Sequence, residues 1–225
     1  MPAEAVPPEI SRVFTTRRET QAFYDKISRY YDLLAEHSEA PMRATGLEML
    51  APQPGDCVLE IGCGTGHCVV GLATTIGSKG RVLALDLSEK MLGVSRDLAA
   101  GRNLASRVRF VCGDGLHLPI RSDAVDSAFL SFTLELFDTS EIPAVLKEVR
   151  RVLRPGGRLV VVGMSKEGPE GVGVEIYEWS HRHFPNFVDC RPIFVARSLA
   201  GAGFRILRTE IKQMWLPVEI VLAAA

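Results

Sequence analysis

The sequence predicts an α/β fold with a doubly wound, largely parallel sheet and helices on both faces. Short apolar segments alternate along the chain with stretches of helical periodicity, and the first apolar segment runs directly into a glycine-rich turn. The apolar segments show no polar alternation, which is typical of parallel strands buried on both sides. A single domain of 225 residues has room for one such sheet.

The glycine-rich turn lies in residues 58–67, with the sequence VLEIGCGTGH. After an apolar strand, Gly62, Gly64 and Gly66 recur at every second position, where the missing side chains let the backbone bend sharply and a ligand come close. Glu60 places a carboxylate at the mouth of this turn. A dinucleotide fingerprint would need its third glycine one residue later, so the spacing disfavours a cofactor with a diphosphate.

The next two predicted strands also end in acidic residues. Residues 81–86 end in Asp86, whose carboxylate can accept hydrogen bonds from both hydroxyls of a ribose. The third strand leads into Gly113-Asp114-Gly115, where the acid can accept from an adenine amino group while the glycines let the ring approach. Because the carboxyl ends of parallel strands share one edge of the sheet, these groups should surround one small-molecule ligand.

The remaining elements follow from periodicity and from helix start and stop signals. Ser88 is a typical N-cap for the helix after the second strand, and the sequence Arg154-Pro155-Gly156-Gly157 ends the helix before the fifth. The predicted strands span residues 58–61, 81–86, 107–112, 124–132, 158–164, 204–211 and 213–222. The predicted helices span residues 17–34, 42–50, 67–76, 88–100, 140–153 and 192–200.

Together these motifs resemble the four successive motifs of class I S-adenosylmethionine-dependent methyltransferases. The resemblance covers about residues 55–165 and includes the E-x-G-x-G-x-G turn, the second strand, the Gly-Asp-Gly segment and the RVLRPGG sequence of residues 151–157. Within that superfamily, residues 23–32 (FYDKISRYYD) are similar to the N-terminal helix of the ubiquinone/menaquinone-biosynthesis (UbiE-like) methyltransferase group.

The resemblance implies a Rossmann-like sheet of seven strands with an antiparallel C-terminal strand, and S-adenosyl-L-methionine as the cofactor. It also implies that residues 1–50 form a helical lid over a methyltransferase domain of residues 51–225. Tyr24 and Tyr31 are the lid side chains expected to reach the cofactor. The expected cofactor-binding residues are Tyr24, Tyr31, Glu60, Gly62, Cys63, Gly64, Thr65, Gly66, Asp86, Leu87, Met91, Gly113, Asp114, Gly115 and Ser131.

The expected chemistry depends mainly on the cofactor, whose sulfonium methyl is already activated. The protein must hold a nucleophile in line and exclude water, and only a hydroxyl acceptor would require a general base. Ser131 and Phe132, at the end of the fourth strand, should face the transferring methyl. The candidate catalytic bases are His183, His181, Glu135 and His37.

The leading substrate prediction is C-methylation of a quinone-precursor aromatic ring. Residues 165–190 depart from the UbiE-like pattern, so O- or N-methylation of another small molecule or a lipid headgroup stays open. Two other classes are also open. An NAD-dependent oxidoreductase would also have an acid at Asp86, but this sequence lacks the glycine spacing of a dinucleotide fingerprint. A non-catalytic adenosylmethionine-binding protein would have the same pocket.

No metal is expected. Cys63 and Cys68 have a conceivable ligand spacing, but Cys63 belongs to the cofactor turn. His181 and His183 could be ligands together with Asp189, but they lie two positions apart, and side chains at positions i and i+2 of a helix do not face each other.

Composition indicates a cytoplasmic protein without a nucleic-acid partner. The 26 basic and 27 acidic residues give a formal charge of −1, which provides no general attraction to polyanions. No segment approaches the roughly 18 apolar residues of a membrane span, and early prolines argue against a signal peptide. Five cysteines, an odd number, indicate a reducing compartment. The expected partner is a small-molecule methyl acceptor, and the oligomeric state stays open.

Overall fold

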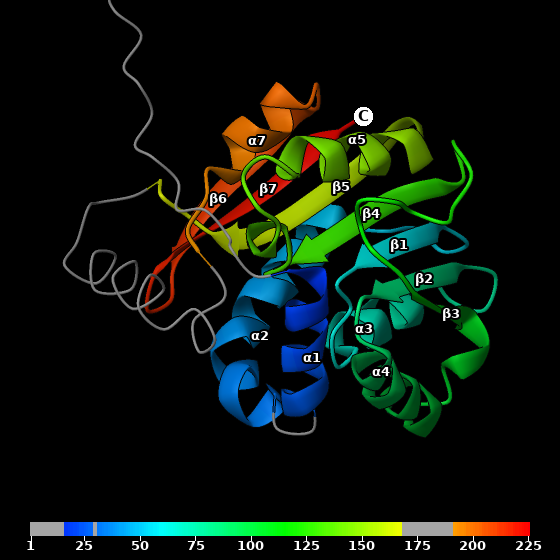
Figure 1. Cartoon of the computed structure of the whole chain (residues 1–225). Helices are drawn as coiled ribbons and strands as arrows, with labels where there is room; N and C mark the ends of the chain where they lie inside the picture. Colours follow the sequence, from blue (N-terminus) through cyan, green and yellow to red (C-terminus); the bar gives the residue numbers. More distant parts are fainter. Residues whose placement is uncertain (1–15, 29–30, 168–190) are drawn as a thin grey trace, which may run out of the picture.

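The structure is a computed structural model that describes residues 16–28, 31–167 and 191–225, with only the backbone of residues 31–37. Its strands form one seven-stranded sheet in the order β3-β2-β1-β4-β5-β7-β6 (Figure 1). Neighbouring strands are parallel, except that β7 is antiparallel to both β5 and β6. The predicted Rossmann-like sheet with an antiparallel C-terminal strand is therefore confirmed. The strands are β1 (Cys57–Ile61), β2 (Arg81–Asp86), β3 (Val108–Cys112), β4 (Val125–Ser131), β5 (Leu153–Met164), β6 (Arg205–Gln213) and β7 (Pro217–Ala224).

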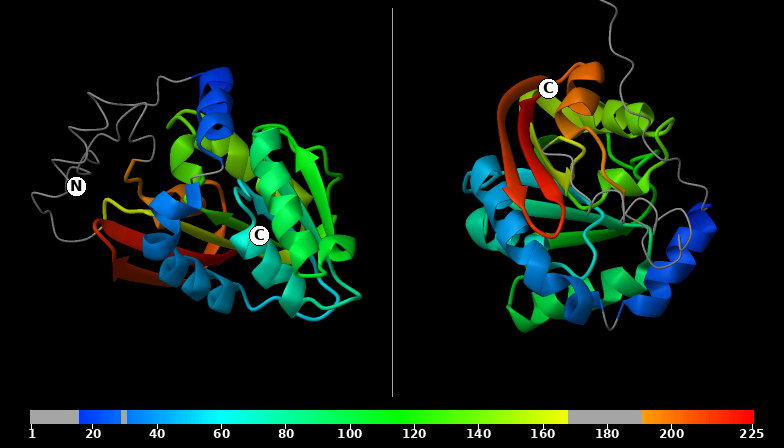
Figure 2. Two further views of the ribbon diagram at one scale, coloured as in Figure 1. Left: turned by 90° about the horizontal axis from the view of Figure 1, so that it is seen from below. Right: turned by 90° about the vertical axis from the view of Figure 1, so that its left-hand side faces the viewer.

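Helices cover both faces of the sheet (Figure 2). Successive residues of β1 point to opposite faces: Val58 packs in a core with α2, α3 and α4, whereas Leu59 packs in a second core with α5 and α7. Two buried faces explain why the strand sequences lack polar alternation. The helices are α1 (Arg17–Ile27), α2 (Tyr31–Leu50), α3 (His67–Thr75), α4 (Glu89–Gly101), α5 (Ile142–Val152) and α7 (Val195–Gly201), with short 3₁₀ turns η1 (Ala105–Arg107) and η2 (Leu134–Leu136).

The N-terminal helices differ from the prediction. The predicted helix over residues 17–34 is wrong because α1 ends at Ile27, and the predicted helix over residues 42–50 is only the second half of α2. Proline is common in the first turn of a helix and is disfavoured in its interior. In the structure Pro41 lies inside α2, whose later turns pack against the sheet through Met42 and Leu50. Tertiary packing therefore offsets the backbone hydrogen bond that proline removes.

The strand boundaries near the C-terminus also differ. β5 begins at Leu153 rather than at residue 158, and the register against β4 shifts between Val125 and Ser127. This shift in register accommodates the turn residues around Gly156, whose φ is +75°. The final hairpin turns at residues 214–216, a few positions later than predicted, so β6 extends to Gln213.

Candidate functional site

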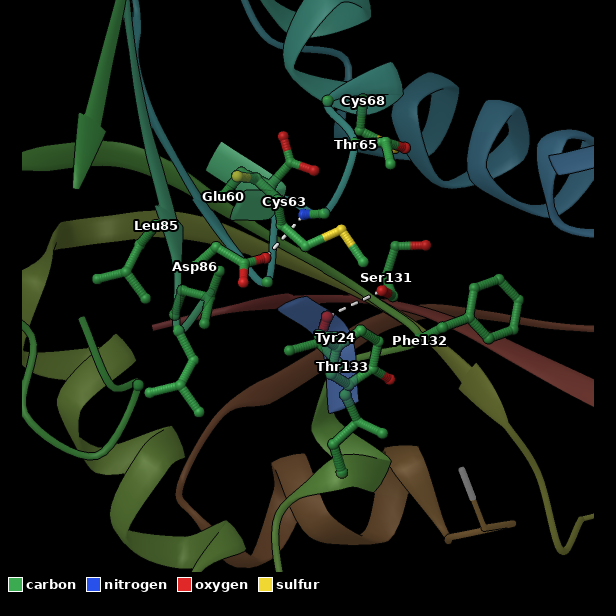
Figure 3. Close-up of a pocket in the computed structure, with 18 of the residues that line it drawn as sticks. Tyr24, Glu60, Cys63, Thr65, Cys68, Leu85, Asp86, Ser131, Phe132 and Thr133 are labelled. Atoms are coloured by element: carbon green, nitrogen blue, oxygen red, sulfur yellow. Dashed lines mark hydrogen bonds between the residues drawn. The ribbon is translucent and has the colours of Figure 1, made fainter. Parts of the chain in front are cut away.

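A cavity opens at the carboxyl edge of the sheet, where the strand order reverses between β1 and β4 (Figure 3). It has a volume of about 960 Å³, counting the part open to solvent. Ligands in doubly wound sheets bind at this position. The ends of β1 to β4 and the loops that follow them form one side, here called the strand-edge wall. The other side, the helical wall, consists of Arg17, Thr20 and Tyr24 from α1 and Glu39 and Arg43 from α2.

The predicted cofactor residues gather in this cavity. Every one of them lines it except Tyr31, whose side chain lies outside the description. Residues from the ends of four strands, β1 to β4, and from α1 thus meet around one space, as the strand-edge prediction required. Their contact with a cofactor remains a prediction.

The glycine turn after β1 fits a backbone that must bend beside a ligand. Gly62 has a φ of +70°, and a Cβ there would lie 2.3 Å from the hydroxyl of Thr133, so no side chain fits. Gly64 has a φ of +51° but no atom within 4 Å of an added Cβ. Because Gly64 lines the cavity, that open space is available to a ligand. The two glycines therefore serve different purposes, protein packing at Gly62 and ligand access at Gly64.

Asp86 is a connecting residue as well as a predicted ribose ligand. It is 9% exposed, and its two carboxylate oxygens accept hydrogen bonds from Gly64 N at 2.8 Å and Ser88 N at 2.9 Å. Burial raises the pKa of Asp86, while these amides lower it. The carboxylate therefore holds the glycine turn against the start of α4. It retains lone pairs that could accept further donors.

Glu60 is the most buried acid in the strand-edge wall. Its side chain is 2% exposed, and within the described residues its Oε2 has no hydrogen-bond partner. Burial raises the pKa of Glu60 well above its usual range, and the charge of Arg43 opposes this effect. Arg43 itself forms an ion pair with Glu39 at 2.9 Å. One cation thus lies among acidic groups at this end of the cavity.

Asp114 follows β3 and contacts the first helix. Its Oδ1 accepts a hydrogen bond from Leu116 N at 3.0 Å, and its Oδ2 lies 3.2 Å from the Nε of Arg17. The Arg17 guanidinium also stacks over the ring of Phe137, 4.5 Å from its centroid. The predicted adenine acceptor is therefore already in contact with a cation from α1.

The end of β4 carries backbone strain beside the cavity. Phe132 has a φ of +49°, which is unusual for a bulky residue, and its amide donates to Val162 O at 2.8 Å. Thr133 donates its hydroxyl to Ser131 O at 2.9 Å, and the Ser131 hydroxyl is buried without a partner among the described residues. Strain of this kind concentrates at functional sites. Phe132 and Ser131 both line the cavity, and their position beside the transferring methyl stays a prediction.

Of the four candidate bases, the structure describes only the side chain of Glu135. It is fully buried behind the cavity rather than among the residues that line it, and its Oε1 accepts from Met164 N at 3.1 Å. Burial raises the pKa of Glu135 to about 8. The side chain of His37 lies outside the description, and so do His181 and His183.

Within the described residues we find neither a metal-binding group of side chains nor a helix that could span a membrane. The described residues contain no group of three or more His, Cys, Asp or Glu side chains that could hold a metal ion, and Cys63 and Cys68 are buried and form no disulfide within them. None of the helices in that part of the chain has the length and apolar character that crossing a bilayer requires.

Sequence reasoning missed most of the helical wall. Arg17, Thr20 and Tyr24 are spaced three and four residues apart, so they share one face of α1, and this spacing could have identified them. Nothing local distinguishes Glu39 and Arg43 from other charged residues of α2. Phe137, which follows the fourth strand, was also missed.

Solved structures with this fold define the class. The chain superposes on a SAM-dependent methyltransferase from Aquifex aeolicus with a TM-score of 0.62 and 22% identity, covering 81% of this chain and 88% of that one. It superposes on the cyclase SpnF with a TM-score of 0.76 and 18% identity, covering 93% and 97%. The fold is thus that of the class I S-adenosylmethionine-dependent methyltransferases, which also carries other chemistry.

Sequence comparison then gives the family. A model of the ubiE/COQ5 methyltransferase family matches residues 13–191, and the chain belongs to this family. A 2-phytyl-1,4-naphtoquinone methyltransferase of Synechococcus elongatus is 34% identical over 65% of this chain and 64% of its own length, less than two thirds. A demethylmenaquinone methyltransferase of Lactobacillus johnsonii is 28% identical over 76% of this chain and 70% of its own length. The expected family resemblance is confirmed.

Proposed function

We propose that the protein is an S-adenosylmethionine-dependent methyltransferase that acts on a small molecule. The observation that carries this proposal is the convergence of Glu60, Asp86 and Asp114, from three successive strand ends, on one cavity with the glycine turn. Membership of the ubiE/COQ5 family supports the same activity.

The residues present fit this cofactor better than a dinucleotide. The amide of Gly64, which in a dinucleotide turn would be free to face a diphosphate, donates to Asp86 instead. Four acidic side chains line the cavity, those of Glu39, Glu60, Asp86 and Asp114, and their negative charge would repel linked phosphates but tolerate a sulfonium cation. The space beside Gly64 would let a ligand approach the backbone, and the buried Oε2 of Glu60, which has no partner in the described residues, could accept a hydrogen bond from it.

We assign the parts of the cavity as follows. Asp86 would accept from the ribose hydroxyls, and Asp114 between its two glycines from the adenine amino group. Arg43 would pair with the carboxylate of the cofactor's amino-acid portion, near Glu60. Residues 1–50 would act as the lid of the domain formed by residues 51–225, with Tyr24 from α1 in the cavity.

For the acceptor we propose a quinone-precursor aromatic ring that is methylated on carbon. The Synechococcus and Lactobacillus relatives are named as quinone methyltransferases, which supports this class. When bound, the cofactor supplies an activated methyl group. The protein would hold the ring against Phe132 and Ser131 and exclude water. Cys63 and Cys68 are buried without a disulfide in the described residues, which supports the proposed reducing, cytoplasmic location.

Two measurements test the proposal. Calorimetry should show binding of S-adenosylmethionine and its product S-adenosylhomocysteine, with no binding of NADH. Methyl transfer should then be assayed with a panel of quinols, phenols and amines. Binding of NADH, or absence of adenosylmethionine binding, would refute the cofactor assignment. Transfer to an amine or phenol oxygen, with none to a quinol, would refute the acceptor class.

A further inference from the structure

Helix α1 makes polar contacts with the cavity region at both of its ends. None of its residues is fully buried, although Phe23, Tyr24 and Ile27 are partly buried. Figure 1 shows it in front of α2, and it contacts α4. Both end contacts lead to carboxylates that line the proposed adenosine site.

The first contact is made by Arg17. Its Nε lies 3.2 Å from Asp114 Oδ2 and its Nη2 lies 2.6 Å from Glu141 Oε2, while the guanidinium plane stacks over Phe137. Glu141 is 124 residues away in sequence and is not among the residues that line the cavity. Arg17 thus joins α1 to the loop after β3 and to the start of α5.

Arg17 is poorly placed for the stability of α1 itself. It is the first helical residue, where the helix dipole disfavours a cation. A capping box between Thr16 and Glu19 already stabilises this end. An arginine that lowers the stability of its own helix indicates that the residue is needed for contacts elsewhere in the fold. The two carboxylates that Arg17 contacts are that requirement.

The second contact is made by Asp25, near the other end of α1. The Ser88 hydroxyl donates to Asp25 Oδ1 at 2.5 Å and accepts from Met91 N, and the Ser88 amide donates to Asp86. Asp86 in turn accepts from Gly64 N. A continuous line of hydrogen bonds therefore runs from α1 through Ser88 to the proposed ribose acceptor and the glycine turn.

We infer that α1 is a lid whose closure is coupled to the adenosine half of the cofactor, with Arg17 as the positioning residue. This rests on the proposed function. Arg17 contacts the carboxylate of Asp114 as an ion pair, and its Nε donates no hydrogen bond within the described residues, so an adenine amino group can bind to Asp114 at the same time. By linkage, the coupling is reciprocal: adenosine binding closes α1, and a closed α1 strengthens adenosine binding.

The test compares two ligands by calorimetry, S-adenosylhomocysteine and methylthioadenosine, which share adenosine but not the amino-acid portion. Arg17→Gln should weaken binding of both ligands by one common factor, about five- to thirtyfold. Glu141→Gln should also weaken binding of both ligands equally, but by a smaller factor. Arg18→Gln is the matched control, because Arg18 is the next residue of α1 and is exposed. It should leave both affinities unchanged.

Hydrogen exchange on the full chain supplies a readout independent of affinity. In the wild type, methylthioadenosine should slow exchange across residues 17–27, and in Arg17→Gln this protection should be largely lost at saturating ligand. Unchanged or tighter binding in Arg17→Gln, or a loss confined to S-adenosylhomocysteine, would overturn the coupling. Unchanged affinities in Glu141→Gln would also overturn the coupling, because Arg17 would then act only as a contact of the ligand. If the wild type binds neither ligand, the proposed cofactor itself is wrong.

Discussion

The strand-edge wall and the helical wall hold their polar groups in different ways. Glu60 and Asp86 are 2% and 9% exposed, and the Asp86 carboxylate is fixed by backbone amides. On the opposite wall, the Arg17 side chain is 28% exposed and its carboxylate partners lie in distant segments. Groups fixed by backbone in a buried sheet cannot adjust to a substitution, whereas exposed ion pairs are weak and adaptable. The strand-edge wall should therefore be far less tolerant of substitution than the helical wall.

The largest effect is expected at Gly64. Gly64→Val would place a branched side chain in the open space beside the turn, and binding of S-adenosylhomocysteine should fall below detection, a loss of more than about 4 kcal/mol. The control is Gly77→Val, because Gly77 has a similar φ of +69°, equal open space and no place in the cavity. Calorimetry on folded protein is the measurement. Equal affinities of the two variants would mean that the turn does not contact the cofactor.

The next effect concerns Glu135, which lies behind the strand-edge wall. Its pKa of about 8 in the folded protein is above its ordinary value of 4.5. A raised carboxyl pKa makes the folded state bind more protons, so the stabilisation is complete below about pH 4.5 and is lost as the pH rises towards 8. Glu135→Gln does not titrate, and its stability relative to wild type should increase by about 2–4 kcal/mol between pH 5 and 9.

Urea unfolding at several pH values measures this difference. Glu48→Gln, which removes an exposed glutamate of α2, is the control for loss of a carboxylate. Parallel stability curves for wild type and Glu135→Gln would show that Glu135 is not buried as the structure describes.

A smaller effect is expected at Asp86. Asp86→Asn should weaken S-adenosylhomocysteine binding by about 1–3 kcal/mol, because it removes a charged acceptor for the ribose and loosens the Gly64 turn. Asp126→Asn is a suitable control, since Asp126 also accepts from a strand amide, Cys57 N at 2.8 Å, but lies outside the cavity lining. If both variants bind equally well, the ribose is held elsewhere.

The smallest effect is expected on the helical wall at Arg43. Arg43→Gln should weaken binding of S-adenosylhomocysteine by about 1 kcal/mol, because it removes the proposed ion pair with the ligand's carboxylate, and should leave binding of methylthioadenosine unchanged. Titration calorimetry with the two ligands makes the comparison directly. An equal loss for both would place Arg43 near the adenosine instead. A loss as large as that of Gly64→Val would remove the distinction between the two walls.

Several features could be predicted from the sequence because they depend on local backbone chemistry. The glycine spacing, the acids at strand ends and the apolar runs fixed the sheet, its covered faces and the residues of the strand-edge wall. The N-terminal helix boundaries could not be predicted, since proline is disfavoured inside a helix and yet Pro41 lies within α2, which packs against the sheet. Glu135 was selected as a base by residue type alone, and only the fold placed it behind the cavity.

The sequence by itself determined the fold class, the family and the strand-edge acids, because strand periodicity and turn geometry are encoded over a few neighbouring residues. Only the tertiary structure decided that Arg17 contacts Asp114 and Glu141, that Asp86 binds the Gly64 amide, and that two helices complete the cavity. These contacts join segments far apart in the chain, and no local pattern specifies which of many charged residues will meet once the sheet is assembled.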